Sequence, residues 1–263
     1  MSVIYGNPVM IGGGDIKISQ VLDENSWSAI KLVSSLGVGE SLWSVGDCKE
    51  VTLNGKISDG LTLTNYTAWV FIIGFNHNAE REGNGIAFQG FKATKNGTPV
   101  CLVDSGYNNS KNRGTWFNMN DSNSTSGGWR LCDMRNKTMP LIKEALPSDL
   151  QAVLKTSSVF TYHPGAGIGR DEGEVFILSE FEVFGKITFS YSEEQNYCKQ
   201  YAYYSAGNSK VKYKHNATST AAKWWERSPR SSDTTNFCHV GTNGGVTNSS
   251  AYWSYGVSPC FKV

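Results

Sequence analysis

The chain has 263 residues, of which 39 % are hydrophobic and 18 % charged, and its formal net charge at pH 7 is +1. This length suffices for one large domain with its own core or for two small domains. The near-neutral balance gives no long-range attraction to nucleic acid, so we expect no nucleic-acid partner. No apolar run approaches the roughly 18 residues that a membrane span needs, so we expect no membrane insertion.

The N-terminal segment carries little charge and contains a glycine triplet at residues 12–14. We interpret residues 1–25 as an arm, which is either a flexible terminus or an assembly segment that docks on a neighbouring subunit. The segment lacks the charged start and the apolar stretch of a secretory signal, so we expect synthesis in the cytoplasm.

Helix and strand patterns alternate in the first half of the chain. Residues 26–36 predict a short helix, because Ser26 can cap it, Trp27, Ile30 and Val33 recur on one side, and Gly37 can end it. Residues 47–53, 69–75, 85–91 and 99–103 predict strands. The second of these is apolar throughout, which is typical of a central strand covered on both faces.

The second half combines long polar stretches with further elements. Residues 105–128 are rich in Asn, Ser and Gly and predict a long surface excursion. Residues 139–144 and 150–155 predict two helical pieces, the second with capping-box spacing at Ser148 and Gln151. Residues 174–181 predict a strand, and Ser192 begins another helix. This order indicates an α+β fold with mixed or antiparallel sheets, a few short helices and long irregular loops.

Catalytic and metal-binding patterns are weak. The six cysteines occur singly without a Cys-x-x-Cys pair, so we expect reduced, buried thiols and no zinc site. The acidic run at residues 171–174 lacks the spacing of a calcium loop, which favours a solvated turn. The four histidines are isolated in sequence and no Gly-x-Ser-x-Gly elbow occurs, although folding can still assemble a triad. We therefore predict a protein that is not an enzyme and that needs no cofactor or metal.

The C-terminal part has the most informative pattern. Two apolar anchors, residues 224–229 and 256–261, enclose a stretch of small polar residues. We call residues 231–255 the C-terminal polar segment, and we expect it to face solvent as a binding surface on a rigid scaffold. Its candidate ligand-binding residues are Ser231, Asp233, Thr235, Asn236, His239, Thr242, Asn243, Asn248, Ser250, Tyr252, Trp253 and Tyr255.

We interpret residues 224–229, the apolar anchor before this segment, as structural support for the binding surface. The guanidinium of Arg227 can donate to several backbone carbonyls while its plane stacks on an indole, as in a buried clamp between loops. Trp224 and Trp225 are interpreted first as core residues.

Six ordered motifs together resemble a known family. They lie at residues 42–55, 70–78, 128–135 followed by Leu146-Pro147, 175–185, 224–229 (Trp-Trp-Glu-Arg-Ser-Pro) and 256–261 (Gly-Val-Ser-Pro-Cys-Phe). Over about residue 27 to the end, the chain resembles the domain family of unknown function numbered 6273, frequent in phages, prophages and gut Firmicutes. The family usually ends Gly-Val-Arg-Pro-Ala-Phe, whereas this chain has Ser258 and Cys260 at the Arg and Ala places, which removes one expected arginine clamp.

The resemblance implies a C-type-lectin-like ligand-binding domain over residues 26–263, as in phage tropism determinants. It implies a tail-tip protein of a phage or prophage, located in the virion tail, with a bacterial surface receptor and other tail proteins as partners. Residues 223–263 resemble the variable region of proteins that diversity-generating retroelements mutate at adenines. We expect a homotrimer joined through the arm.

Two alternatives remain open at the level of sequence. One is a structural tail or baseplate component, in which the polar segment is merely solvated. The other is an oxidase of the formylglycine-generating type, which shares the broad fold and needs a copper-binding cysteine pair. Cys238 and Cys260 are the candidates for such a pair.

Overall fold

A computed structural model describes residues 9–11, 14–16, 18–110 and 116–263. Most of the glycine triplet and much of the expected arm therefore lie outside the described residues. The helices are η1 (Leu22–Glu24), α1 (Trp27–Ser35), η2 (Gly39–Ser41), α2 (Ala79–Glu82), α3 (Gly128–Leu131), η3 (Met134–Thr138), α4 (Met139–Ala145), α5 (Ser148–Gln151), α6 (Glu180–Phe184), η4 (Ser192–Asn196) and α7 (Ala202–Ser205).

The strands form several antiparallel sheets. They are β1 (Val9–Ile11), β2 (Gly14–Ile16), β3 (Cys48–Ser58), β4 (Leu61–Phe75), β5 (Ile86–Lys92), β6 (Val100–Cys101), β7 (Ser157–His163), β8 (Gly167–Gly173), β9 (Val175–Phe176), β10 (Lys212–Lys214), β11 (Ala217–Ala222), β12 (Trp224–Pro229), β13 (Asn236–Val240), β14 (Val246–Ser250) and β15 (Cys260–Lys262). Short helices interspersed among these sheets make an α+β fold, as the sequence predicted.

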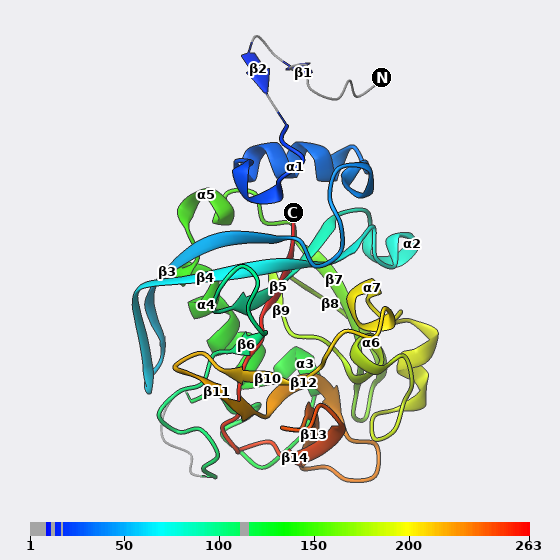
Figure 1. Cartoon of the computed structure of the whole chain (residues 1–263). Coiled ribbons are helices and arrows are strands. Elements are labelled where there is room, and N and C mark those ends of the chain that lie inside the picture. The colour runs from blue at the N-terminus through cyan, green and yellow to red at the C-terminus, as the bar shows by residue number, and fades with distance from the viewer. Residues whose placement is uncertain (1–8, 12–13, 17, 111–115) are drawn as a thin grey trace.

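The largest sheet has the order β3-β4-β5-β15-β9 (Figure 1). Its pairs are all antiparallel, and β15 joins β5 to β9 although it comes from the C-terminal end of the chain. The apolar run of β4 is buried from Val70 to Ile73, which confirms a strand covered on both faces. The chain end is therefore fixed in the middle of the core.

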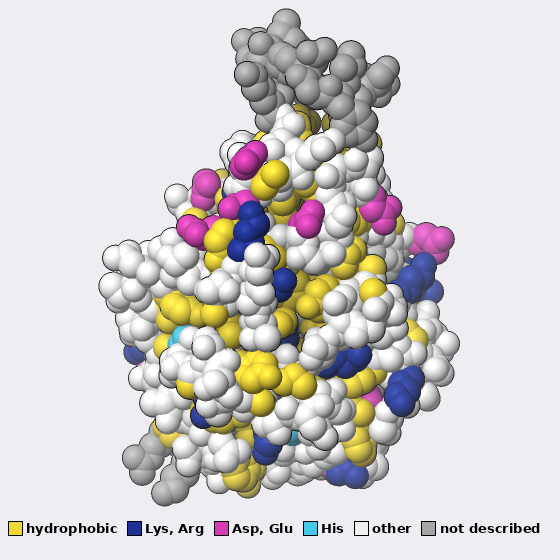
Figure 2. All heavy atoms as spheres, in the orientation of Figure 1, with side chains coloured by type: hydrophobic (Ala, Val, Ile, Leu, Met, Phe, Trp, Pro, Cys, Tyr) yellow, Lys and Arg dark blue, Asp and Glu magenta, His cyan; other side chains and the backbone are white. Residues whose placement is uncertain are grey.

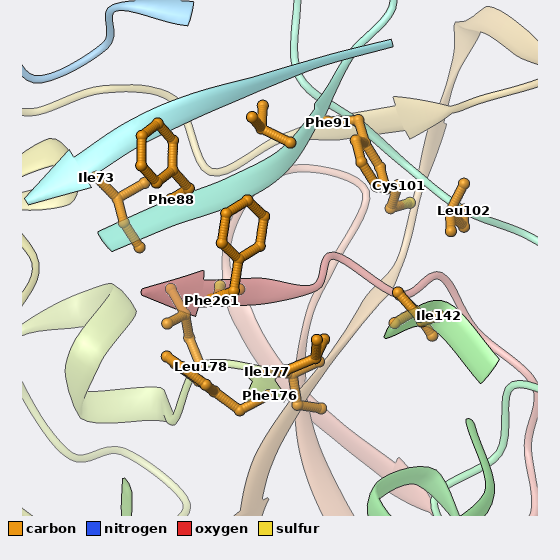
Figure 3. Close-up of a cluster of buried hydrophobic side chains, with 14 of the residues drawn as sticks. Ile73, Phe88, Phe91, Cys101, Leu102, Ile142, Phe176, Ile177, Leu178 and Phe261 are labelled. Atoms are coloured by element: carbon orange, nitrogen blue, oxygen red, sulfur yellow. The ribbon is translucent and has the colours of Figure 1, made fainter. Parts of the chain in front are cut away.

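Helix α1 covers one face of this sheet, at the top of Figure 1. The Ser26 side chain accepts the Ala29 N–H and so caps the helix, and Gly37 follows it with a φ of +70°. Trp27 packs edge-on against Phe88 and Phe261 at ring distances of 5.4 and 6.1 Å. Figure 3 shows Phe88 and Phe261 in the apolar cluster that continues to β9 and α4.

Residues 19–25 pack on this body. The Trp43 indole donates to the Ser19 carbonyl at 3.0 Å, and Leu22 is buried. The side chain of Asp23 accepts the Glu50 N–H at 2.9 Å. The part of the expected arm next to α1 thus belongs to the domain surface.

Two predicted elements differ from the structure. The strand predicted over residues 174–181 ends at Phe176, and helix α6 begins at Glu180. A capping box between Ser179 and Glu182 satisfies the first free N–H groups of that helix and overrides the apolar pattern. The capping box predicted at Ser148 does not form, because Ser148 already lies inside α5 and makes no cap.

The excursion at residues 105–128 is not wholly a surface loop. Phe117 and Met119 are fully buried. The Met119 N–H donates to the Ala251 carbonyl at 2.9 Å, and the Tyr255 N–H donates to the Phe117 carbonyl at 3.1 Å. Part of this loop therefore packs beneath the C-terminal polar segment, because its apolar residues have a core to enter.

Two small sheets lie at the end of the molecule opposite α1 (Figure 1). One has the order β12-β13-β14, and the other has the order β11-β10-β6 with a parallel pair between β10 and β6. Among the described residues, no helix has the length and hydropathy required to cross a bilayer.

Candidate ligand-binding surface

The C-terminal polar segment folds as the outer part of the β12-β13-β14 sheet. Strand β12 is buried along its whole length, β13 is buried except at Asn236, and all five residues of β14 are partly exposed. The register pairs Asn236 with Ser250 and Cys238 with Asn248. The residues of this sheet thus become more exposed from β12 through β13 to β14.

The twelve candidate residues fall into three classes of exposure. The exposed ones are Ser231, Thr242 and Asn243; the partly exposed ones are Asp233, Thr235, Asn236, Asn248, Ser250, Tyr252 and Trp253; the buried ones are His239 and Tyr255. Ten of the twelve therefore have some surface that a ligand can reach.

His239 and Tyr255 require a correction, because their exposures are only 1 % and 2 %. The His239 ring lies 5.5 Å from the Trp225 ring and 4.8 Å from the Tyr255 ring, centroid to centroid. The pleat of β13 turns His239 toward this aromatic group rather than toward solvent. Both residues support the surface from below instead of forming it.

Hydrogen bonds and an ion pair connect polar side chains of β13 and β14 with those of residues 230–235. The Asn248 carbonyl oxygen accepts from the Asn236 amide at 2.9 Å and from the Arg230 guanidinium at 3.1 Å. Arg230 also pairs with Asp233 at 3.0 Å, and the other carboxylate oxygen of Asp233 accepts the Thr235 N–H at 2.9 Å. This network limits the rotamers of the polar surface, which lowers the entropy lost on binding.

A hydrogen-bonded chain crosses the other face of the sheet. Lys223 Nζ lies 3.3 Å from the Tyr255 hydroxyl, which lies 3.1 Å from Ser249 Oγ, which lies 3.0 Å from His239 Nε2. Burial lowers the pKa of His239 to about 4, so its ring is neutral at pH 7. Efficient general bases have a pKa near the working pH, so this histidine is a poor base for activating Ser249.

Beneath the sheet, Arg227 occupies the centre of a buried polar network. Its guanidinium forms two bonds to the Glu182 carboxylate, at 2.6 and 2.5 Å. It also donates to the Ile177 carbonyl at 2.8 Å, the Phe160 carbonyl at 3.1 Å and the Thr161 hydroxyl at 2.9 Å. Backbone acceptors were expected for Arg227, whereas no sequence pattern indicated Glu182 as the counter-charge.

The two tryptophans of β12 are buried and fully bonded. The Trp224 indole donates to the Lys210 carbonyl at 2.9 Å, and the Trp225 indole donates to the Phe117 carbonyl at 2.8 Å. The first bond ties β12 to the segment before β10, and the second ties it to a loop about a hundred residues earlier in the chain. This geometry agrees with the support role expected for Trp224 and Trp225.

More carboxyl groups surround Arg227 than cations. Glu180 accepts the backbone N–H groups of residues 188–190, which fixes the loop after α6. Burial raises the pKa of Glu194 to about 7, and the group accepts bonds from Ser228 and from the Tyr162 N–H. Burial also raises the pKa of Glu226, whose carboxylate oxygens have no hydrogen-bond partner among the described residues.

Among the described residues, one group has metal-ligand spacing. Ligand atoms of His77, Glu82 and Glu182 lie within 4.8 Å of one another, and His77 Nε2 has no partner there. However, Lys262 already pairs with Glu82 at 2.5 Å, and Arg227 pairs with Glu182. Added positive charge would face two buried cations, so this group fits a structural role better than a metal site.

The acidic run at residues 171–174 also has internal partners. Asp171 is buried and bonds Arg130 at 2.8 Å and His163 at 2.7 Å. Burial by itself would raise the pKa of Asp171, but the hydrogen bonds from His163 and Arg130 and the charge of Arg130 outweigh it and hold the pKa below its ordinary value. The solvated turn that the sequence favoured is therefore wrong for Asp171, which lies on β8.

A cleft of about 340 Å³ lies between α4 and strands β8 and β9. Its charged side chains are paired within the protein, since Lys143 contacts Glu174 and Arg135 donates to the Glu172 carbonyl at 2.9 Å. None of the twelve candidate residues lines it. The cleft therefore lies apart from the C-terminal polar segment.

The cysteines proposed for the oxidase alternative are both buried. Cys238 Sγ lies 3.8 Å from the Glu180 carboxylate, and burial raises the pKa of both Cys238 and Cys260. Copper needs thiolate ligands, and a raised pKa opposes thiolate formation. The geometry therefore disfavours the oxidase alternative.

A family model described as Domain of unknown function (DUF6273) matches residues 93–263. No curated protein and no solved structure matches the chain. The matched range includes all of the β12-β13-β14 sheet and the Arg227 network.

Substituting Arg227 tests the buried network. Arg227→Met leaves Glu182 as a buried charge without its partner, so we expect a loss of about 3 to 5 kcal/mol in the free energy of unfolding, measured by urea denaturation. The double variant Arg227→Met/Glu182→Leu should lose less than the sum of the two single variants. Arg170→Met, which breaks the exposed pair with Glu172, is the control and should cost under about 1 kcal/mol. Equal costs at the two arginines would contradict the network.

Acid should weaken the protein through His239. Its pKa is about 4 in the folded chain and 6.5 ordinarily, so between these values the unfolded chain binds more protons and stability falls as pH falls. Between pH 6.5 and 4.5 this histidine should account for a loss of roughly 2 kcal/mol. Urea denaturation across this range should show a shallower pH dependence for His239→Gln than for the unchanged protein. Parallel curves would show that His239 does not titrate in this way.

Proposed function

Because the chain belongs to the family described as Domain of unknown function (DUF6273), we propose a function from the geometry of its own surface. We propose that the C-terminal polar segment binds a ligand on the surface of a bacterial cell. The protein is then the tail-tip, receptor-binding component of a phage or prophage, located in the virion tail. Residues 26–263 form the binding domain, with a C-type-lectin-like fold.

The observation that carries this proposal is the gradient across the β12-β13-β14 sheet. Strand β12 is buried, while each residue of β14 keeps part of its surface exposed and β14 lies at the edge of the sheet. Polar groups fixed on a rigid base are typical of a surface that recognises a partner.

The composition of the surface suits recognition of varied ligands. Tyr252 and Trp253 are partly exposed and offer contact area at a small entropy cost, while the Asn, Ser and Thr side chains offer adaptable hydrogen bonds. A single site of this kind binds weakly, and a homotrimer joined through residues 1–25 would raise avidity. Other tail proteins would hold that arm.

A structural tail component is the competing function. It would use the same fold, and the polar segment would contact nothing outside the particle. The partly exposed aromatic pair at Tyr252 and Trp253 favours binding over this alternative, because large rings at the surface are enriched at contact sites.

Adsorption to cells tests the proposal. Tyr252→Ala/Trp253→Ala should lower binding of the labelled protein to its host cells by about tenfold or more, because aromatic anchors dominate such interfaces. Thr242→Ala/Asn243→Ala, at exposed positions, should lower it less. Leu36→Ala, which removes an exposed side chain at the end of α1, is the control and should bind normally. Normal adsorption by folded forms of both double variants would favour the structural alternative.

Diversification leaves a trace in DNA. If a retroelement varies residues 223–263, the downstream DNA should contain an imperfect repeat of these codons, with mismatches confined to adenines, near a reverse-transcriptase gene. Sequencing the locus checks this expectation. An absent repeat would remove diversification from the proposal and leave ligand binding unaffected.

A further inference from the structure

One stretch of the chain is basic in a protein that is otherwise close to neutral. Between Glu194 and Glu226 the sequence contains five lysines and no Asp or Glu. These lysines are Lys199, Lys210, Lys212, Lys214 and Lys223. The stretch includes strands β10 and β11. Strand β11 ends at Ala222, and β12 begins at Trp224. The fold thus places a basic hairpin directly before the sheet that carries the C-terminal polar segment.

Two of these lysines lie over a pair of tyrosines. Lys214 Nζ is 4.5 Å from the centroid of the Tyr107 ring, and Lys223 Nζ is 4.7 Å from the centroid of the Tyr255 ring. The two rings meet edge to face at 6.3 Å. Both ammonium groups are therefore held beside one aromatic pair, and both side chains remain partly exposed.

Neither ammonium group has a carboxylate partner among the described residues. Lys223 Nζ contacts the Tyr255 hydroxyl at 3.3 Å and the Asn108 side-chain oxygen at 3.5 Å, which are both neutral. By contrast, Arg230 on the other face of the sheet pairs with Asp233 at 3.0 Å. A cation with only neutral contacts keeps its capacity for a charge-assisted hydrogen bond, which an anion satisfies best.

These lysines are continuous with the proposed binding surface. The Tyr255 hydroxyl links Lys223 to Ser249 on β14, at 3.1 Å from Ser249 Oγ. Figure 2 shows acidic side chains gathered in the upper part of this face, near α1, whereas Lys and Arg side chains predominate in the lower part. A negatively charged ligand would therefore meet little repulsion along the end of the molecule that carries β10 to β14.

We infer that Lys214 and Lys223, with Tyr107 and Asn108 beside them, form a subsite for an anionic group of the ligand. The ligand class is an anionic cell-surface polymer whose repeating unit carries a phosphate or a carboxylate. This inference rests on the proposed function, because it names the chemistry of the ligand for the same surface. The lysines supply the charge, and the neutral polar atoms around them supply the remaining hydrogen bonds.

Binding of defined polymers tests the subsite. The probes are poly(glycerol phosphate), polygalacturonate and neutral dextran, with affinity measured at low and high salt. The unchanged protein should bind at least one anionic polymer, and raising NaCl from about 50 to about 300 mM should weaken that binding severalfold because salt screens exposed charges. Preference between the two anionic polymers identifies phosphate or carboxylate as the group that is recognised.

Variants assign the effect to the two lysines. Lys214→Gln/Lys223→Gln should weaken binding of the preferred polymer by roughly fivefold to tenfold, while Lys214→Arg/Lys223→Arg should retain it. Lys31→Gln/Lys186→Gln removes the same charge from other exposed positions and should change the affinity less than about twofold. Thermal unfolding of each variant confirms that it is folded.

The outcomes separate this inference from the proposed function. Failure of the unchanged protein to bind either anionic polymer would overturn the subsite, as would equal, salt-independent binding of dextran. Normal adsorption of the folded Lys214→Gln/Lys223→Gln variant to host cells would also overturn it while leaving receptor binding intact. Polymer binding without adsorption to cells would support the subsite and contradict the proposed receptor function.

Discussion

The bidentate pair between Arg227 and Glu182 is the interaction on which the C-terminal half depends. Both side chains are buried, so each charge needs the other, and the guanidinium uses its remaining donors on carbonyls near residues 160 and 177. Three segments that are distant in sequence, around residues 160, 177–182 and 227, thereby meet at one cation. Because β12 carries Arg227 and pairs with β13, which pairs with β14, this meeting anchors the buried edge of the sheet.

This constraint explains how a polar surface can be rigid. The interior side of the sheet is fixed by indole and guanidinium bonds, and the exterior side is fixed by the network around Asn248 and Asp233. Little conformational entropy is then left to lose when a ligand binds. The anchoring bonds of this surface come from the buried strand β12.

The buried carboxyl groups have a separate consequence. Glu180 is solvated by backbone N–H groups, Glu182 is paired, and Glu194 and Glu226 have raised pKa values. These buried carboxyl groups are thus paired with a cation, hydrogen-bonded to N–H groups, or shifted in pKa toward the neutral form. Glu194 joins Ser228 on β12 to the Tyr162 N–H on β7, which links the packing of the core to the sheet that carries the surface.

Local sequence patterns determined several helices and strands of this protein and its fold class. The amphipathic residues of α1 with their Ser26 cap, the doubly covered strand β4 and the α+β class follow from periodicity and capping, which act between near neighbours. The polar residues 231–255 between apolar anchors indicated a surface, and ten of the twelve candidate residues have exposed area.

Only the tertiary structure decided the rest. Helix α6 forms where a strand was predicted. The Ser179–Glu182 capping box stabilises its first turn, and Glu182 also pairs with Arg227, which is 45 residues away in sequence. His239 and Tyr255 became support, because the pleat of β13 and the aromatic contacts of Trp225 exist only in the folded sheet. Lys214 and Lys223 belong to one basic stretch of the sequence, but only the fold places them over Tyr107 and Tyr255. Long-range pairing carries no local pattern, so the sequence identified the surface segment, and the fold determined which of its side chains face outward and which charges lie beside them.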